Sequence, residues 1–134
     1  MKSEPPSAPT NAATAPPGRF TELSAARQAL VRLCQLIDYG HIRNVFVRDG
    51  EPVLADAEAI ISTDIRLDQS KLVRSELELN DFELTSEVLR LAALLDEIGD
   101  GEIAQIEVRA GLPRRVVTTR SVTQCMLVLN ESVG

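Results

Sequence analysis

The side chains of this sequence that could do chemistry are those of histidine, aspartate, glutamate and arginine. The chain has only one histidine. His41 follows Gly40 at the expected start of a strand, and the position 61 residues later holds Glu102. A catalytic triad or a zinc site would have to form without a second histidine or closely spaced cysteines. We therefore expect His41 at the surface. An alternative hypothesis places it with Tyr39 and Glu102 in a small-ligand or catalytic cleft.

Carboxylates are dense between residues 76 and 83, where an acid–base pair or a cation site is the next possibility. The acidic positions there alternate with leucine and phenylalanine, which is typical of an ordinary element with one solvated side. The chain also contains no P-loop, dinucleotide-binding glycine motif or nucleophile elbow. We therefore predict that the protein is not an enzyme and has no metal site or cofactor. The acidic residues are Glu76, Glu78, Asp81 and Glu83.

Arginines in and after two similar hexapeptides form the clearest candidate binding set. The hexapeptides are VRDGEP at 47–52 and VRAGLP at 108–113. Guanidinium groups on a two-stranded ribbon could bind phosphates or the carboxylates of a partner protein, and at a sheet edge they also oppose unwanted strand pairing. The candidate binding residues are Arg48, Arg109, Arg114, Arg115 and Arg120.

Charge and aromatic content favour a protein partner over nucleic acid. The formal net charge is −6, and one tyrosine and three phenylalanines are the only aromatic residues, which is poor provision for base stacking. We therefore predict a non-catalytic adaptor or assembly module that binds another protein or a second copy of itself. The alternative is a nucleic-acid-associated accessory protein that uses the arginines of the second hairpin.

The similarity of the hexapeptides extends to their surroundings and predicts an internal duplication. Aligned with itself at a shift of 61, the chain has eleven identities in the 31 positions from Glu22 to Pro52, where random pairing would give roughly two. The matched residues include the glycines and prolines that fix backbone shape.

Each repeat is expected to begin with an amphipathic helix and to continue as a β-hairpin. Ser24 and Thr85 are suitable N-caps, and we expect Gly40 and Gly101 to end the helices with a positive φ. The strands turn at the hexapeptides, and an alternating pattern predicts a third strand at residues 59–67 and another at 122–129. The apolar stripes of the helices are Leu23, Leu30, Cys34 and Ile37, and Leu84, Val88, Leu91, Leu95 and Ile98.

The predicted fold class is α+β, with two helix-hairpin-strand units related by a pseudo-two-fold axis and an antiparallel sheet packed by two helices. Residues 1–18, with five of the seven prolines, form a disordered Pro/Ala-rich tail. Residues 19–68 form the first repeat, residues 69–81 a connector with a short helix or strand, and residues 82–134 the second repeat.

The cysteines and the apolar patterning predict a cytoplasmic protein. Cys34 and Cys125 match no metal or redox motif, and both are expected to be buried in a reducing compartment. The chain shows no export signal and no apolar run of about 18 residues. We therefore predict no membrane partner.

The stretch LCQLIDYGHIRNVFVRDGEPVL at residues 33–54 resembles YezD-like small bacterial proteins, a family without an established activity. The resemblance lies in the order of a helix, Tyr-Gly, a strand that ends in a basic residue, glycine and a second strand. In the second half Asp100 replaces Tyr39. The resemblance implies that one helix-hairpin unit exists as a small bacterial protein. Because such a unit needs a partner to cover its apolar faces, we expect this chain to carry in tandem what its smaller relatives achieve by pairing.

Overall fold

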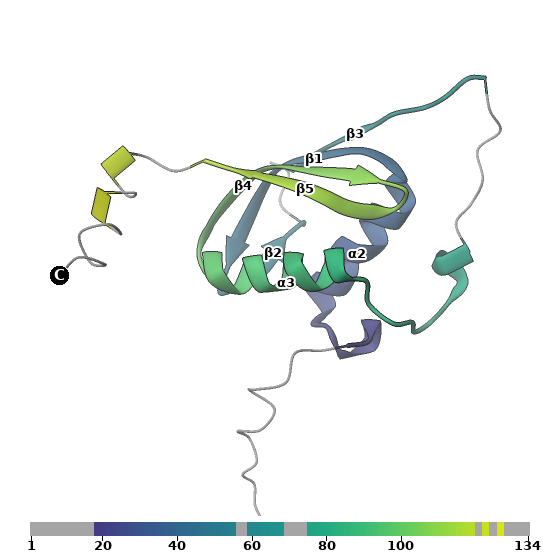
Figure 1. Cartoon of the computed structure of the whole chain (residues 1–134), viewed down its shortest axis with the longest axis horizontal. Coiled ribbons are helices and arrows are strands. Elements are labelled where there is room, and N and C mark those ends of the chain that lie inside the picture. Colours follow the sequence, from purple (N-terminus) through teal and green to yellow (C-terminus); the bar gives the residue numbers. More distant parts are fainter. Residues whose placement is uncertain (1–17, 56–58, 69–74, 120–121, 124–125, 128–134) are drawn as a thin grey trace, which may run out of the picture.

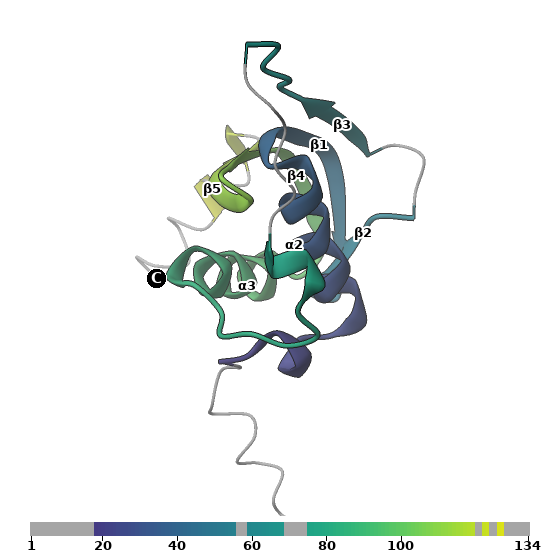
Figure 2. The same cartoon turned by 90° about the vertical axis from the view of Figure 1, so that its right-hand side faces the viewer.

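The computed structural model describes residues 18–55, 59–68, 75–119, 122–123 and 126–127. Within these ranges the chain forms two α-helices and a five-stranded antiparallel sheet, which confirms the predicted α+β class. Both helices lie against the same face of the curved sheet (Figures 1 and 2). The elements are η1 Phe20–Glu22, α2 Ala25–Ile37, β1 Tyr39–Arg48, β2 Glu51–Val53, β3 Ile60–Thr63, η2 Ser75–Glu78, α3 Ser86–Ile98, β4 Gly101–Arg109 and β5 Leu112–Thr118.

The centre of the sheet is the antiparallel pair of β1 and β4. Tyr39 lies opposite Arg109, and Val47 lies opposite Gly101. The strand order is β2-β1-β4-β5, and β3 pairs with residues 40–43 of β1 on the edge that β2 uses at residues 46–48. Strands β2 and β3 therefore form one side of the sheet, and β5 forms the other.

The two halves of the described chain match at the predicted shift of 61. The side chains of Ser24 and Thr85 cap α2 and α3 by accepting hydrogen bonds from backbone N–H groups three residues on, which confirms the predicted N-caps. The turns match as well, because the first residue of each has a φ of 55° and the glycine that follows has a φ of 76°. Two successive positive φ values are what a type I′ hairpin turn requires.

Each hairpin turn is bound to the end of the helix in the other half. The N–H of Gly50 donates to the carbonyl of Gly99 at 2.8 Å, and the N–H of Gly111 donates to the carbonyl of Asp38 at 2.9 Å. If each residue is replaced by its equivalent 61 positions away, one of these bonds becomes the other. The same replacement turns pairs of the β1–β4 register into other pairs of that register, for example Gly40–Val108 into Gly101–Val47. This exchange is what a pseudo-two-fold axis requires, whereas an origin by duplication stays a prediction.

The main core lies between the helices and the central strands. The buried residues of β1 and β4, which lie two or three positions apart, point toward the helices, where they meet the apolar stripes of α2 and α3. Full burial of one aliphatic side chain of this size contributes about 1.5–3 kcal/mol, so this layer is the main source of stability. Its most buried members include Leu30, Cys34, Ile42, Val45, Leu95, Ile103 and Ile106.

A second cluster ties the start of the described chain to the segment that precedes α3. Phe20 stacks on Phe82 with ring centroids 4.7 Å apart, and the guanidinium of Arg32 lies 4.4 Å from the Phe20 centroid. The Nε of Arg19 donates to a carboxylate oxygen of Asp81 at 2.7 Å, and this hydrogen bond is the main reason that the pKa of Asp81 falls to about 2. Leu23 and Leu84, predicted as the first residues of the helical stripes, precede the N-caps and pack in this cluster.

The predicted role of Gly40 and Gly101 as positive-φ helix ends is wrong. Asp38 and Gly99, each with a φ of 67°, follow the helices, and both predicted glycines lie at the starts of strands. Gly40 is required for another reason, because a Cβ there would overlap the backbone carbonyl oxygen of Ser62 in β3. The close approach of β3 to β1 therefore explains this glycine.

The third strand of each predicted unit is shorter than expected or missing where the chain is described. In the first half only Ile60–Thr63 is a strand, within the predicted 59–67. In the second half residues 122–123 and 126–127 are helical, so the predicted strand at 122–129 is wrong there. The connector contains the short helix η2, which falls within the predicted 69–81. The predicted tail residues 1–17 and Cys125 lie outside the described residues.

Ala110 is a site where the backbone can be relaxed. Alanine in the left-handed region costs about 1 kcal/mol, whereas asparagine is favoured at the first position of a type I′ turn. We expect Ala110→Asn to raise the free energy of unfolding by about 0.5–1 kcal/mol in urea titrations. Asp49→Asn at the matching turn is the control, because aspartate already tolerates this conformation. If both variants raised the free energy of unfolding equally, or if Ala110→Asn did not raise it, the backbone at Ala110 would not be strained.

Gly40→Ala tests the close approach of β3. The added Cβ meets backbone rather than a flexible side chain, so the strands must separate, and we expect a loss of at least about 2 kcal/mol in the free energy of unfolding. Gly18→Ala is the matched control, because a Cβ added at Gly18 would have no atom within 4 Å and stability should change little. Unfolding curves of equal midpoint for both variants would show that β3 does not approach β1 in this way.

Candidate interaction edges

The predicted arginine set does not form one surface. Arg48 ends β1 and Arg109 ends β4, and because these strands are antiparallel the two residues lie at opposite ends of the sheet. Arg109 faces Tyr39 across the strands, so nine residues of β1, or about 30 Å, separate the two arginines. Arg120 lies outside the described residues.

Two arginines of the predicted set lie on β5, where they contact acids of the same chain. Arg114 donates to the carboxylate of Glu87 on α3 at 3.2 Å, and Arg115 lies 3.9 Å from the carboxylate of Glu107. The pKa of Glu87 is lowered, mainly because its carboxylate accepts a hydrogen bond from its own backbone N–H, with a smaller contribution from Arg114. Both guanidinium groups are about half exposed or more, so they remain available to solvent and to a partner.

The hypothetical cleft of Tyr39, His41 and Glu102 is not formed. On the sheet face away from the helices, Tyr39 lies opposite Arg109 and His41 lies opposite Glu107. Glu102 lies at the other end of β4, opposite Phe46. Five residues of strand separate Glu102 from Glu107, or about 17 Å, so the three side chains cannot converge on one ligand of small size.

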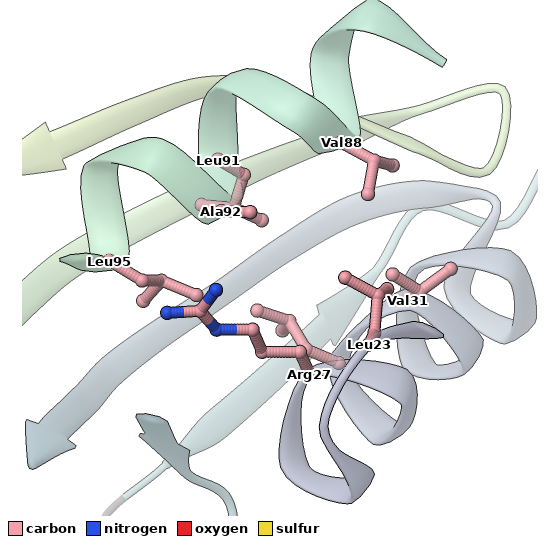
Figure 3. Close-up of a pocket in the computed structure, with 8 residues that line it drawn as sticks. Leu23, Arg27, Val31, Val88, Leu91, Ala92 and Leu95 are labelled. Carbon is pink, nitrogen blue, oxygen red and sulfur yellow. The ribbon is translucent and has the colours of Figure 1, made fainter. Parts of the chain in front are cut away.

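A pocket between the two helices is lined by apolar side chains and by Arg27 (Figure 3). The Arg27 guanidinium donates to the carbonyl of Gly50 at 2.8 Å and to the carboxylate of Asp96 at 2.5 Å. It thereby joins α2 to the first turn and to α3. These two bonds use the same terminal nitrogen of Arg27, and the buried Nε has no hydrogen-bond partner among the described residues. The other side chains that line the pocket are apolar.

Two of the three outer strands carry features that oppose strand pairing. β5 contains Pro113, Arg114 and Arg115, and its pairing with β4 has two register shifts. β2 is only three residues long and contains Glu51 and Pro52. Charges, prolines, bulges and short length are the devices by which sheet edges avoid pairing with other chains.

β3 has none of these charges or prolines, although it also lies at an edge. Its residues Ile60–Thr63 are uncharged and mostly β-branched, and within the described residues β3 pairs only with β1. Ile60 and Ile61 are 51% and 48% exposed, and the residues that follow the strand include Ile65 at 67% and Leu67 at 96%. An exposed apolar edge of this kind is a site where another strand can be added.

The backbone of β3 also presents hydrogen-bonding groups outward. The N–H of Asp64 donates to the carbonyl of Tyr39 at 2.8 Å, so Asp64 points its backbone polar groups toward β1. Residues at even spacing from Asp64, namely Ser62 and Ile60, do the same, because hydrogen-bonded positions of an antiparallel pair recur every second residue. The N–H and carbonyl groups of Ile61 and Thr63 therefore face away from the sheet.

The sequence pattern identifies this segment but does not indicate that it lies exposed at a sheet edge. The alternation of Ala59, Ile61, Thr63, Ile65 and Leu67 predicts a strand, and the prediction is correct only for Ile60–Thr63. It predicts a half-buried strand, whereas the structure leaves both of its faces largely exposed. The lack of any charge from Ala59 to Thr63, in a chain that is 25% charged, is the signal that could have identified an unprotected edge.

Other kinds of site find little support in the parts of the chain that the structure describes. No three histidine, cysteine, aspartate or glutamate side chains gather there as a metal site would require. Cys34 is a buried free thiol, and burial raises its pKa to about 12, so it is not poised as a nucleophile. No helix among the described residues is long and apolar enough to cross a membrane.

The outer strands of the sheet are therefore the candidate interaction sites among the described residues. Comparisons by sequence and by structure supply no relative. No protein-family model, curated protein or solved structure matches the chain.

Proposed function

We propose that this chain is a non-catalytic protein-interaction module of the bacterial cytoplasm, and that it binds an extended segment of a partner chain at the outer edge of β3. The observation that carries the proposal is the contrast between the edges of one sheet. β2 and β5 are guarded by charges, prolines and irregular pairing, and β3 is not.

Strand addition at β3 would use groups that are already in place. The outward N–H and carbonyl groups of Ile61 and Thr63 would bond to the backbone of the partner, which supplies affinity without dependence on the partner's sequence. The half-exposed Ile60 and Ile61 side chains would lose contact with water on the two faces of the extended sheet. The partner segment is thus expected to be extended and to carry apolar residues at alternate positions.

The alternative, an accessory protein bound to nucleic acid, has less support. Its arginines would have to follow a phosphate backbone, but Arg48 lies at the far end of the sheet from Arg109. Arg114 and Arg115 face acids of the same chain. A net charge of −6 also opposes approach to a polyanion.

A matched pair of edge variants tests the proposed function. Ile61→Lys places a charge on the β3 edge, and Val117→Lys makes a similar change on β5, where the side chain is 37% exposed. The affinity-tagged chain is incubated with a lysate of the native organism to which a differently tagged second copy of the chain has been added. We expect the wild type and Val117→Lys to capture the same proteins. Ile61→Lys should recover them at least about tenfold less, because a desolvated charge opposes pairing there.

Quantitative mass spectrometry gives the recoveries, and thermal unfolding shows that both variants remain folded. Equal recovery by wild type and by folded Ile61→Lys would show that β3 is not the binding edge. Equal loss with both variants would show that edge charge has only a general effect.

A further inference from the structure

We infer that the segment bound at β3 is β3 of a second copy of this chain, paired antiparallel about a two-fold axis that passes beside Thr63. The inference rests on the proposed function and specifies its partner. It follows from the outward backbone groups, from the side-chain order of residues 59–67 and from the guarding of the other edges.

The backbone limits the possible registers of such a pair. Only Ile61, Thr63 and, if the strand continues, Ile65 point their N–H and carbonyl groups outward. In a two-fold antiparallel pair, outward-pointing residues of one copy lie opposite outward-pointing residues of the other. Thr63 opposite Thr63 of the second copy satisfies this condition, and the pair requires β3 to continue from Thr63 to Ile65.

The side chains fit this register on both faces of the sheet. On the helix-side face Ile61 meets Ile65 of the second copy on each side of the central threonine, and Leu67 lies in a turn beyond these pairs. On the other face Ser62 meets Asp64, and Ile60 meets the long side chain of Arg66. No like charges oppose one another.

Neighbouring registers fit less well. An axis beside Ser62 places Ile60 opposite Asp64 and leaves Ile65 at the margin. An axis beside Ile61 leaves both Ile65 residues beyond the paired region. The Thr63 register covers the most apolar surface, because Ile61 of each copy lies opposite Ile65 of the other. These side chains are 48% and 67% exposed in the single chain.

The guarded edges limit the assembly to two copies. A pair formed through β3 uses the same edge of both chains and is closed by its symmetry. Pairing of β3 with β5 of another copy would extend without limit, but Arg114, Arg115 and the register shifts of β5 oppose it. The expected product is a dimer with one continuous sheet.

Charge substitution at Thr63 tests this arrangement, because the side chain is exposed in the single chain and faces its own copy only in the proposed dimer. Sedimentation velocity would be measured between about 1 µM and about 1 mM, which spans weak to moderate affinity. We expect the wild type to reach twice the 14.6 kDa mass of the chain. Thr63→Lys and Thr63→Glu alone should each raise the dissociation constant at least about tenfold by like-charge repulsion, and an equal mixture should restore association.

Thr118→Lys on β5 is the matched control and should dimerise as the wild type does. A wild type that stays monomeric over the whole range would overturn self-pairing, while β3-dependent capture of other proteins in the lysate experiment would still support the proposed function. A wild-type dimer that tolerates both folded Thr63 variants would place the contact elsewhere and also overturn the inference. Failure of the mixture to associate, when each variant alone is monomeric, would contradict a two-fold axis beside Thr63.

Discussion

The antiparallel pairing of β1 with β4 is the constraint on which the rest of the structure depends. It joins residues that are about sixty positions apart and brings the two halves of the chain side by side in one sheet. It also brings each hairpin turn to the end of the opposite helix, where the bonds from Gly50 to Gly99 and from Gly111 to Asp38 form. Neither half has a core of its own, because the helices of both halves cover a shared pair of strands.

The same pairing decides which edges remain open. Once β1 and β4 occupy the centre, β5 and the β2–β3 side become the outer strands. The two sides differ in composition although the halves are alike in helices and turns. The second hairpin is long, irregular and rich in arginine, whereas the first is cut short at Val53 and is followed by an uncharged, isoleucine-containing strand. The resulting asymmetry leaves a nearly symmetric sheet with one outer strand that has no charge and no proline.

Local features could be predicted from the sequence, and spatial relations could not. The N-caps Ser24 and Thr85 and the two turns follow from residue type and spacing, since a cap or a turn depends on a few neighbouring residues. The pattern around Gly40 suggests the wrong constraint because its real neighbour, Ser62, is distant in sequence. Equivalent arginines are expected to act together, but antiparallel pairing places Arg48 and Arg109 at opposite ends. An alternating pattern also does not indicate whether another element covers its apolar side. The exposure of Ile61 at the sheet edge could therefore not be predicted from the sequence.

The central pairing has a consequence for synthesis of the chain on the ribosome. α2 and β1 emerge first, but the strand that completes their sheet, β4, begins only at Gly101. At elongation rates of about 5–20 residues per second, a delay of about sixty residues lasts about 3–12 s. During that interval β1 lacks the strand and the second helix that cover its apolar inner face in the folded chain. Chaperones that hold nascent chains, or a neighbouring nascent chain of the same polysome, would meet this surface before the native fold can hide it.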